Sequence, residues 1–248
     1  MQAKAYSARF ETWLIRRFMR SAFSRFSIDY LREACVNIHG IYKIFQHYFR
    51  PKRIRALKLA LPVLSDAKTT VLDIGGTADW WADVAPVTSD ITIVNLDARL
   101  EADCLRAGYK FKVVDGRSLP FADGQFDLVH SNSVVEHVGS FDDQQRFVSE
   151  LKRCGKAIYL QTPNKWFPVE PHLVAVFIHW LPFAIERRLV RWLSVWGWVQ
   201  RPTQAQIDEF LLSTRLLDGR EIDRMFPGYR RCDEKFFGLT KSFVVVKS

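Results

Sequence analysis

The 248-residue sequence is poor in cysteine, and its four cysteines show no pattern of metal ligands. Cys35, Cys104, Cys154 and Cys232 stand far apart, outside the CxxC or Cys/His spacing of zinc sites. We therefore expect free thiols in a reducing cytoplasm and no bound metal. The chain also lacks a run of about 18–20 apolar residues and an apolar signal-peptide core at its start. These absences predict a cytoplasmic protein rather than a membrane-spanning or secreted one.

Acidic residues are scarce in the first part of the chain. Residues 1–58 hold 13 Lys/Arg against 3 Asp/Glu, whereas the remainder holds 23 against 24, so the net charge of +9 belongs to the N-terminal part. Residues 8–26 place aromatic and aliphatic side chains at helical spacing among arginines, which is typical of a basic amphipathic helix. Such a helix either docks on the protein, which we favour because packing stabilises most helices, or makes a peripheral contact with the inner face of a membrane. We predict a basic helical extension over residues 1–68.

After residue 68, short β-rich runs alternate with helical patterns. The runs cover residues 69–76, 91–97, 109–116, 126–132 and 156–164. This alternation predicts a parallel α/β sheet covered on both faces, with a ligand site where the strands end. We interpret residues 69–248 as one domain with a helical insertion at about 165–226, and the C-terminal end as two strands joined near Gly238.

The run Val71–Gly76, VLDIGG, combines a strand with a glycine turn, and a helix is expected from about Ala78. Glycine lets a backbone approach a ligand closely, and the amides of a following helix can face a carboxylate. Asp97 ends the next strand, where an acid can accept hydrogen bonds from ribose hydroxyls. NAD enzymes share these features, but DIGGTA lacks their full glycine fingerprint, and no GxxxxGK[ST] phosphate loop is present.

Four segments in order, VLDIGG, NLD, VVDGRSLPFADGQFDLV and SNSVVEHV, resemble the class I S-adenosylmethionine (SAM)-dependent methyltransferases. The resemblance is to the ubiquinone/menaquinone-biosynthesis-like type (methyltransferase type 11 group) and covers about residues 69–165 and the terminal strands. It implies an enzyme that uses SAM and releases S-adenosylhomocysteine (SAH). It also implies a Rossmann-like, doubly wound α/β fold: a seven-stranded, mostly parallel sheet with an antiparallel terminal hairpin, N-terminal helices and a helical cap.

The resemblance also implies which residues bind SAM. Asp73, Gly75 and Gly76 would form the loop beneath the methionine part, and Asp97 would hold the ribose hydroxyls. Asp115 would accept from the adenine amino group beside the amide of Gly116, and Asn132 and Ser133 would flank the sulfonium. Asp127 matches a structural position. Thr77 departs from the family, which usually has glycine there, so the loop either seats the SAM carboxylate differently or no longer binds SAM.

Three residues are our candidates for catalysis, because transfer to a hydroxyl or amine requires removal of a proton. His172 is the first choice as general base: it ends the proline-stiffened segment QTPNKWFPVEPH, which follows the fifth strand and also presents Glu170. The alternative is that His172 caps the next helix or bonds within the loop. His137, in the EHV turn, is either structural or catalytic, and His130 lies inside the fourth strand, where a packed histidine is expected.

The acceptor is predicted to be a small molecule, such as a saccharide, a lipid-linked glycan precursor or a secondary metabolite, methylated on a hydroxyl. The aromatic stretch 173–199 suits a sugar face or an acyl chain, or contributes to an oligomer. An RNA or protein acceptor is the alternative, supported by the basic N-terminus. The sequence does not favour nucleic acid, because it has no RNA-binding module and SNSV stands where amino-nitrogen methyltransferases carry Asn-Pro-Pro-Tyr. A non-catalytic adaptor at the membrane surface is the third reading.

Overall fold

The computed structural model describes residues 49–248 except 59–60, 62–63, 65–67 and 85–89. The chain divides into two compact units, Met1–Lys52 and Arg53–Ser248, and the account below concerns the second. The expected amphipathic helix at 8–26 lies outside the described residues, and the expected domain boundary after residue 68 stays a prediction.

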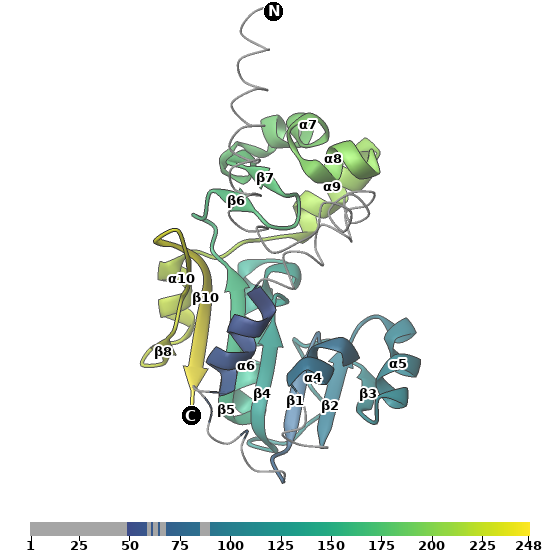
Figure 1. The fold of residues 1–248 in the computed structure, drawn as a ribbon, viewed down its shortest axis with the longest axis vertical. Helices are drawn as coiled ribbons and strands as arrows, with labels where there is room; N and C mark the ends of the chain where they lie inside the picture. The colour runs from purple at the N-terminus through teal and green to yellow at the C-terminus, as the bar shows by residue number, and fades with distance from the viewer. Residues whose placement is uncertain (1–48, 59–60, 62–63, 65–67, 85–89) are drawn as a thin grey trace, which may run out of the picture. The chain divides into compact units, whose positions relative to one another are not determined.

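The second unit is built on a mixed sheet in which the predicted parallel strands pair in the order expected of a Rossmann-like fold (Figure 1). The main path is β3-β2-β1-β4-β5-β10-β8, with parallel pairing as far as β5 and antiparallel pairing from β10 onward. The mostly parallel sheet is thus confirmed, with eight strands in place of the expected seven. The bounds are β1 Val71–Ile74, β2 Ile91–Asn95, β3 Lys110–Val113, β4 Phe126–Asn132, β5 Gly155–Pro163, β8 Arg230–Arg231 and β10 Leu239–Lys247.

An eighth short strand, β9 (Glu234–Phe236), pairs with β10 outside that path. The two are joined at Phe237 and Gly238, which both have positive φ. A tight turn with left-handed residues favours glycine, so the predicted terminal hairpin lies where the sequence placed it.

Each face of the sheet carries its own core, because alternate strand residues point to opposite sides. On one face, side chains such as Ile158 and Leu160 pack against α6 (Phe141–Cys154) and α10 (Gly219–Met225). On the other, Ala157 and Tyr159 pack with Leu57 of the helical residues 53–58 and with α4 (Ala78–Val84) and α5 (Glu101–Arg106). Burial on both faces explains the apolar runs of the inner strands β1 and β2, whereas the edge strand β3 exposes both of its lysines.

Side-chain caps set the starts of several helices. Ser140 and Asp143 form a reciprocal capping box at α6, and Asp218 and Glu221 form one at α10. These boxes satisfy amides that have no partner within the helix. Helix α10 therefore begins at Gly219, directly after its capping residue Asp218.

The segment after β5 folds into a cap with its own small apolar core. It begins with the hairpin of β6 (Val169–Glu170) and β7 (Ala175–Val176) and continues through the 3-10 turn η4 (Ile178–Trp180). Three helices follow: α7 (Phe183–Leu193), α8 (Val195–Gln200) and α9 (Gln204–Ser213). Leu173, Ile178, Val190 and Ile207 are buried among these elements. Among the described residues, no helix has the length and apolar character needed to cross a bilayer.

One backbone hydrogen bond joins the two ends of the cap to each other, and another fastens the cap to the sheet domain. Lys165 N donates to Leu217 O, and Arg215 N donates to Glu136 O, at 2.9 and 2.7 Å. The chain therefore leaves β5 and returns to α10 at nearly the same place, which holds the cap over the carboxyl end of β5 (Figure 1).

Asp127 ties β4 to the residue that precedes β1. Its carboxylate accepts from Thr70 N at 3.0 Å, from Thr70 Oγ1 at 2.9 Å and from Lys156 Nζ at 2.8 Å. The Lys156 hydrogen bond, followed by those from Thr70, lowers the pKa of Asp127 to about 2. Through these contacts Asp127 performs the structural role that the resemblance implies for it.

We expect Asp127→Ala to lower the free energy of unfolding by about 1–3 kcal/mol at pH 7, because hydrogen bonds to a charged group are lost. A carboxyl whose pKa is depressed in the folded state stabilises above the unfolded pKa of about 3.9. The difference from wild type should therefore shrink as pH falls from about 4 toward 2. Urea unfolding at pH 7, 5, 4 and 3 measures it, with the exposed Glu209→Ala as control. If the loss of unfolding free energy in Asp127→Ala were the same at every pH, the ionised carboxylate of Asp127 would not be its cause.

Candidate functional site

The predicted cofactor residues lie where the parallel strands end, at one edge of the sheet. Gly75 and Gly76 follow β1, Asp97 follows β2, Asp115 follows β3, and Asn132 and Ser133 close β4. Parallel pairing of β3, β2, β1, β4 and β5 brings these carboxyl ends together. The sheet thus groups residues that are up to 60 positions apart in the sequence.

The glycine loop rests on a buried carboxylate. Asp73, 1% exposed, accepts a hydrogen bond from Trp81 Nε1 at 2.7 Å and lies 2.7 Å from Nδ1 of His130, which is equally buried. A Cβ at Gly76 would lie 1.7 Å from Asp73 Oδ2, so only glycine fits there. Asp73 therefore supports the glycine loop from inside the protein. Its contacts with Trp81 and His130 were not predicted from the sequence.

Two further features shape this loop. Gly75 has a φ of +76°, and a Cβ there would collide with Val134 Cγ2 at 2.5 Å. Asn95 Nδ2 donates to Gly76 O at 3.1 Å, which joins the loop to the end of β2. Thr77, in the position where the family usually has glycine, is exposed and immediately precedes α4. The side chain of Thr77 thus takes no space inside the loop.

Asp97 and Asp115 are each paired with an arginine two residues further on. Arg99 donates to both oxygens of Asp97 at 2.8 and 2.7 Å, and Arg117 makes the same bidentate pair with Asp115 at 3.0 and 2.6 Å. These hydrogen bonds lower the pKa of both carboxyls. Both acids are therefore ionised acceptors at neutral pH. The arginines were missed in the sequence, although the repeated D-x-R spacing was a visible signal.

Gly116 is required by packing rather than by its own conformation. A Cβ there would lie 2.6 Å from the Phe147 ring of α6 and 2.8 Å from Ile74 Cγ2. The loop after β3 therefore lies directly against α6, which fixes the position of the neighbouring Asp115.

The end of β4 turns sharply at Ser133, whose φ is +57°. Ser133 N donates to Gln161 O at 2.9 Å, and Ser133 Oγ donates to Gln161 Oε1 at 2.8 Å. Asn132 Oδ1 accepts from Arg53 Nη1 at 3.4 Å. A non-glycine residue in this backbone region is strained and is found most often at functional sites.

The three predicted catalytic residues are brought together over this edge. Glu170, buried in β6, lies with Oε1 2.6 Å from His172 Nδ1, and His172 Nε2 lies 3.1 Å from His137 Nε2. Thr214 Oγ1 is 3.4 Å from His137 Nδ1. Because Glu170 accepts a hydrogen bond best from an Nδ1–H donor, this network makes His172 Nε2 the acceptor nitrogen, which faces His137 Nε2. His172 thus makes a hydrogen bond within its own loop, which was the alternative role expected for it. The same bond fixes the orientation of the imidazole ring.

The two histidines differ in their affinity for a proton. Burial lowers the pKa of His172, but the charge and hydrogen bond of Glu170 outweigh that effect and raise it above the usual value. Burial, followed by repulsion from His172, lowers the pKa of His137 to about 4. At neutral pH His137 is therefore uncharged, and a proton arriving at the pair goes to His172.

Glu136, the acid of the EHV turn, completes the group. It is fully buried, and burial raises its pKa. Thr162 Oγ1 donates to Glu136 Oε2 at 2.9 Å, while Glu136 Oε1 lies 4.0 Å from His172 Nε2. Donor atoms of Glu136, His137 and His172 lie within 4.8 Å of one another, close enough for one divalent ion to bridge them. No ligand spacing in the sequence indicates such a group, because His172 joins it from the cap.

Residues 72–157 match the family model described as a methyltransferase domain. The family match and the fold support a class I SAM-dependent methyltransferase. It is 24% identical over 162 residues to the malonyl-[acyl-carrier protein] O-methyltransferase of Pseudescherichia vulneris, and the match spans 62% of this chain and 63% of that relative.

Two solved methyltransferases are similar to this one in structure. The magnesium protoporphyrin IX methyltransferase of Synechocystis PCC 6803, with bound SAH, is 12% identical with a TM-score of 0.54, covering 94% of this chain and 100% of its own. The N-methyltransferase NodS of Bradyrhizobium japonicum WM9, with SAH, is 15% identical with a TM-score of 0.49 and coverages of 80% and 86%. The first likeness shows that the two chains share a fold.

We expect Gly76→Ala to weaken SAH binding at least about tenfold, because the new methyl group displaces Asp73 and the loop above it. Calorimetric titration with SAH measures the affinity, and circular dichroism checks the fold. Gly219→Ala is the matched control, since a Cβ there meets its nearest atoms at 3.6 Å. Equal affinity in the two variants would show that the loop does not carry the cofactor.

Proposed function

We propose that this chain transfers the methyl group of SAM to a hydroxyl of a small-molecule acceptor, with His172 as general base. The observation that carries the proposal is the Glu170–His172 pair at 2.6 Å, placed by the cap over the carboxyl end of β5. Its geometry is that of a base held by a carboxylate, the arrangement that prepares an imidazole to take a proton.

The residues present fit SAM. Ribose hydroxyls and the adenine amino group are hydrogen-bond donors, and the ends of β2 and β3 offer the ionised acceptors Asp97 and Asp115. Gly75, Gly76 and Thr77 would face the methionine part with backbone amides before α4, and Gly116 would offer its amide near the adenine. Asn132 and Ser133 would border the sulfonium at the turn after β4.

SAM supplies the electrophilic methyl group, so the protein has to position the acceptor and remove its proton. His172 Nε2 would accept the hydroxyl proton as the oxygen attacks, and Glu170 would stabilise the resulting imidazolium through Nδ1. In the described structure His137 Nε2 lies where that hydroxyl would approach. An acceptor hydroxyl would therefore have to replace His137 Nε2 as the hydrogen-bond partner of His172 Nε2.

The acceptor class we propose is a saccharide or a lipid-linked glycan precursor, with a secondary metabolite as a further possibility. Support comes from Trp166, Phe177 and Trp180, which are exposed on the cap and contact one another with ring centroids 6.1 and 5.0 Å apart. Exposed aromatic faces bind sugar rings and acyl chains. The relative named as an O-methyltransferase supports an oxygen rather than a nitrogen as the methylated atom.

Loss of the acid after β2 should abolish most cofactor affinity. We expect wild-type protein to bind SAM and SAH, and Asp97→Ala to bind SAH about 10–100-fold more weakly, because charge-assisted hydrogen bonds to the ribose are lost. Calorimetry measures both, with Asp103→Ala, an exposed acid of α5, as control. If well-folded wild-type protein binds neither SAM nor SAH, the methyltransferase proposal is wrong and the non-catalytic adaptor is favoured.

Removal of the base should slow turnover without affecting cofactor binding. We expect His172→Ala to lower kcat by about 10²–10⁴-fold, the usual contribution of a general base, while the Kd for SAH stays unchanged. SAH release is followed in a screen of saccharides and lipid-linked sugars, with His179→Ala, a cap histidine bonded to Lys165 O, as control. Each assay is repeated after chelation. If a chelator abolishes the activity and a divalent ion restores it, the general-base role of His172 is wrong. The group of Glu136, His137 and His172 then holds a metal ion instead.

A further inference from the structure

Three side chains of the kinds that bind metal ions converge at the proposed base. His172 Nε2 lies 3.1 Å from His137 Nε2 and 4.0 Å from Glu136 Oε1, and one donor atom of each residue lies within 4.8 Å of the others. Ligand atoms bound to one tetrahedral zinc ion at about 2.0–2.2 Å are about 3.3 Å apart. The two histidines therefore already have nearly the spacing of zinc ligands, and the carboxylate has to move by less than about 1 Å.

The far atoms of these side chains are held in place by the protein. Glu170 Oε1 lies 2.6 Å from His172 Nδ1, and Thr162 Oγ1 donates to Glu136 Oε2 at 2.9 Å. Metal ligands in proteins ordinarily have such partners, which orient the ligand and raise its affinity for the ion. A histidine whose far nitrogen donates to a carboxylate is one form of this arrangement. The atoms that remain for an ion, His172 Nε2 and Glu136 Oε1, lie at the centre of the group.

Glu136 supplies a second, independent sign of a cation. Its side chain is fully buried, and Oε1 has no hydrogen-bond partner among the residues that the structure describes. A buried carboxylate oxygen without a donor is unfavourable and requires an explanation such as a bound ion. Together with the buried Glu170, Glu136 brings two carboxylates to the group. Their negative charges, when both are ionised, equal the positive charge of one divalent ion.

We propose that Glu136, His137 and His172 bind one zinc ion, and that zinc inhibits methyl transfer because it occupies Nε2 of the base. Two imidazoles and one carboxylate are a known zinc ligand set, whereas magnesium and calcium prefer oxygen ligands. The ion would lie between the two Nε2 atoms, and His137 would keep its ring proton on Nδ1, 3.4 Å from Thr214 Oγ1. Zinc binding does not depend on the proposed function, but the inhibition rests on it.

Zinc binding is measured by calorimetry on the full chain, with magnesium as the comparison ion. We expect saturable binding of zinc and none of magnesium. His137→Ala should weaken zinc binding by more than the about 10–100-fold that the loss of a ligand's supporting partner costs. Cobalt(II), which absorbs visible light strongly when it is four-coordinate, should give a spectrum in wild type that His137→Ala lacks.

A second variant tests the site if His137→Ala does not fold. Glu136→Gln keeps the shape of the side chain and an acceptor for Thr162, but it removes the charge. It should weaken zinc binding while the Kd for SAH, which checks the fold, stays unchanged. Equal zinc affinity in wild type and in a folded variant of either residue would overturn the site.

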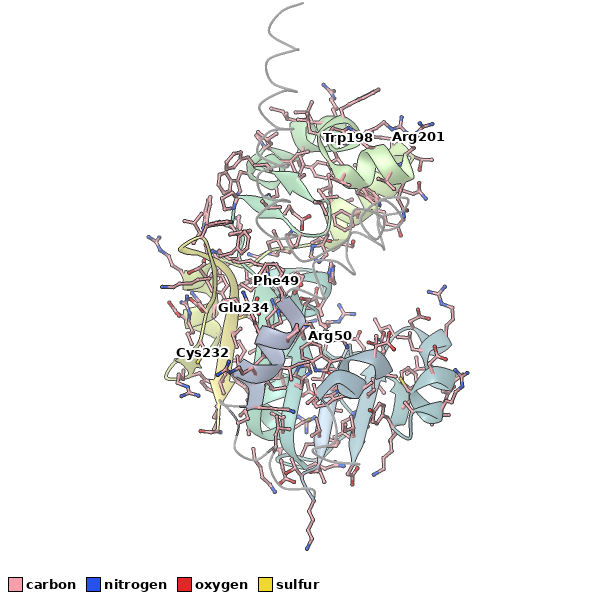
Figure 2. All side chains as sticks on the ribbon, viewed as in Figure 1. Phe49, Arg50, Trp198, Arg201, Cys232 and Glu234 are labelled. Atoms are coloured by element: carbon pink, nitrogen blue, oxygen red, sulfur yellow. The ribbon has the colours of Figure 1, made fainter. Side chains whose placement is uncertain are left out.

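Two control variants test for zinc bound elsewhere. Cys232, labelled in Figure 2, is an exposed thiol between β8 and β9. His179 lies in the cap, with Nε2 2.9 Å from Lys165 O. Cys232→Ser and His179→Ala should both bind zinc as wild type does. A loss of zinc binding in either control, with His137→Ala unaffected, would place the ion outside the proposed site.

Turnover separates this inference from the proposed function. Added zinc should stop SAH release in the acceptor screen, a chelator should restore it, and the Kd for SAH should stay the same. A chain that turns over an acceptor but shows no His137-dependent zinc binding removes the zinc site alone. Zinc that binds at the site without slowing turnover refutes both the inhibition and His172 as the base. Turnover that requires zinc refutes both as well.

Discussion

The buried carboxylate of Asp73 is the constraint around which the cofactor edge is built. It stands at the end of β1, receives Trp81 from α4 and contacts His130 from β4, so one side chain joins a strand, the next helix and the neighbouring strand. Its oxygen occupies the space where a side chain of residue 76 would be. The glycine is therefore a consequence of the carboxylate, and the shape of the loop follows from both. An isolated buried charge is very unfavourable, which makes the two partners as necessary as the acid itself.

The catalytic proposal depends on a different principle, the joining of two modules. His137 belongs to the turn after β4, whereas Glu170 and His172 belong to the cap. The hydrogen bond from Arg215 N to Glu136 O brings the returning chain next to that turn. The base is thus oriented within the cap by Glu170, while its distance from the sheet is set by the attachment of the cap.

The sequence was informative where one physical rule acts over a short range. Strand alternation, the glycine turn and the Asp218 cap were predictable because each depends on residues within a few positions. The His137–His172 contact joins residues that are 35 positions apart, and the Arg53–Glu234 pair joins residues 181 positions apart. Periodicity carries no information on such pairs. His130 was expected to be packed, but its role as a partner of Asp73 required the register of β1 and β4.

The cap has a core of its own, made of residues such as Leu173, Val190 and Ile207, which is separate from the two cores of the sheet. Substitutions that repack this small core therefore leave the energetics of the cofactor edge nearly untouched, since distant sites contribute additively. The cap and the sheet are therefore two packing units within one chain. A change to the side chains that fill the core of the cap does not alter those that fill either core of the sheet.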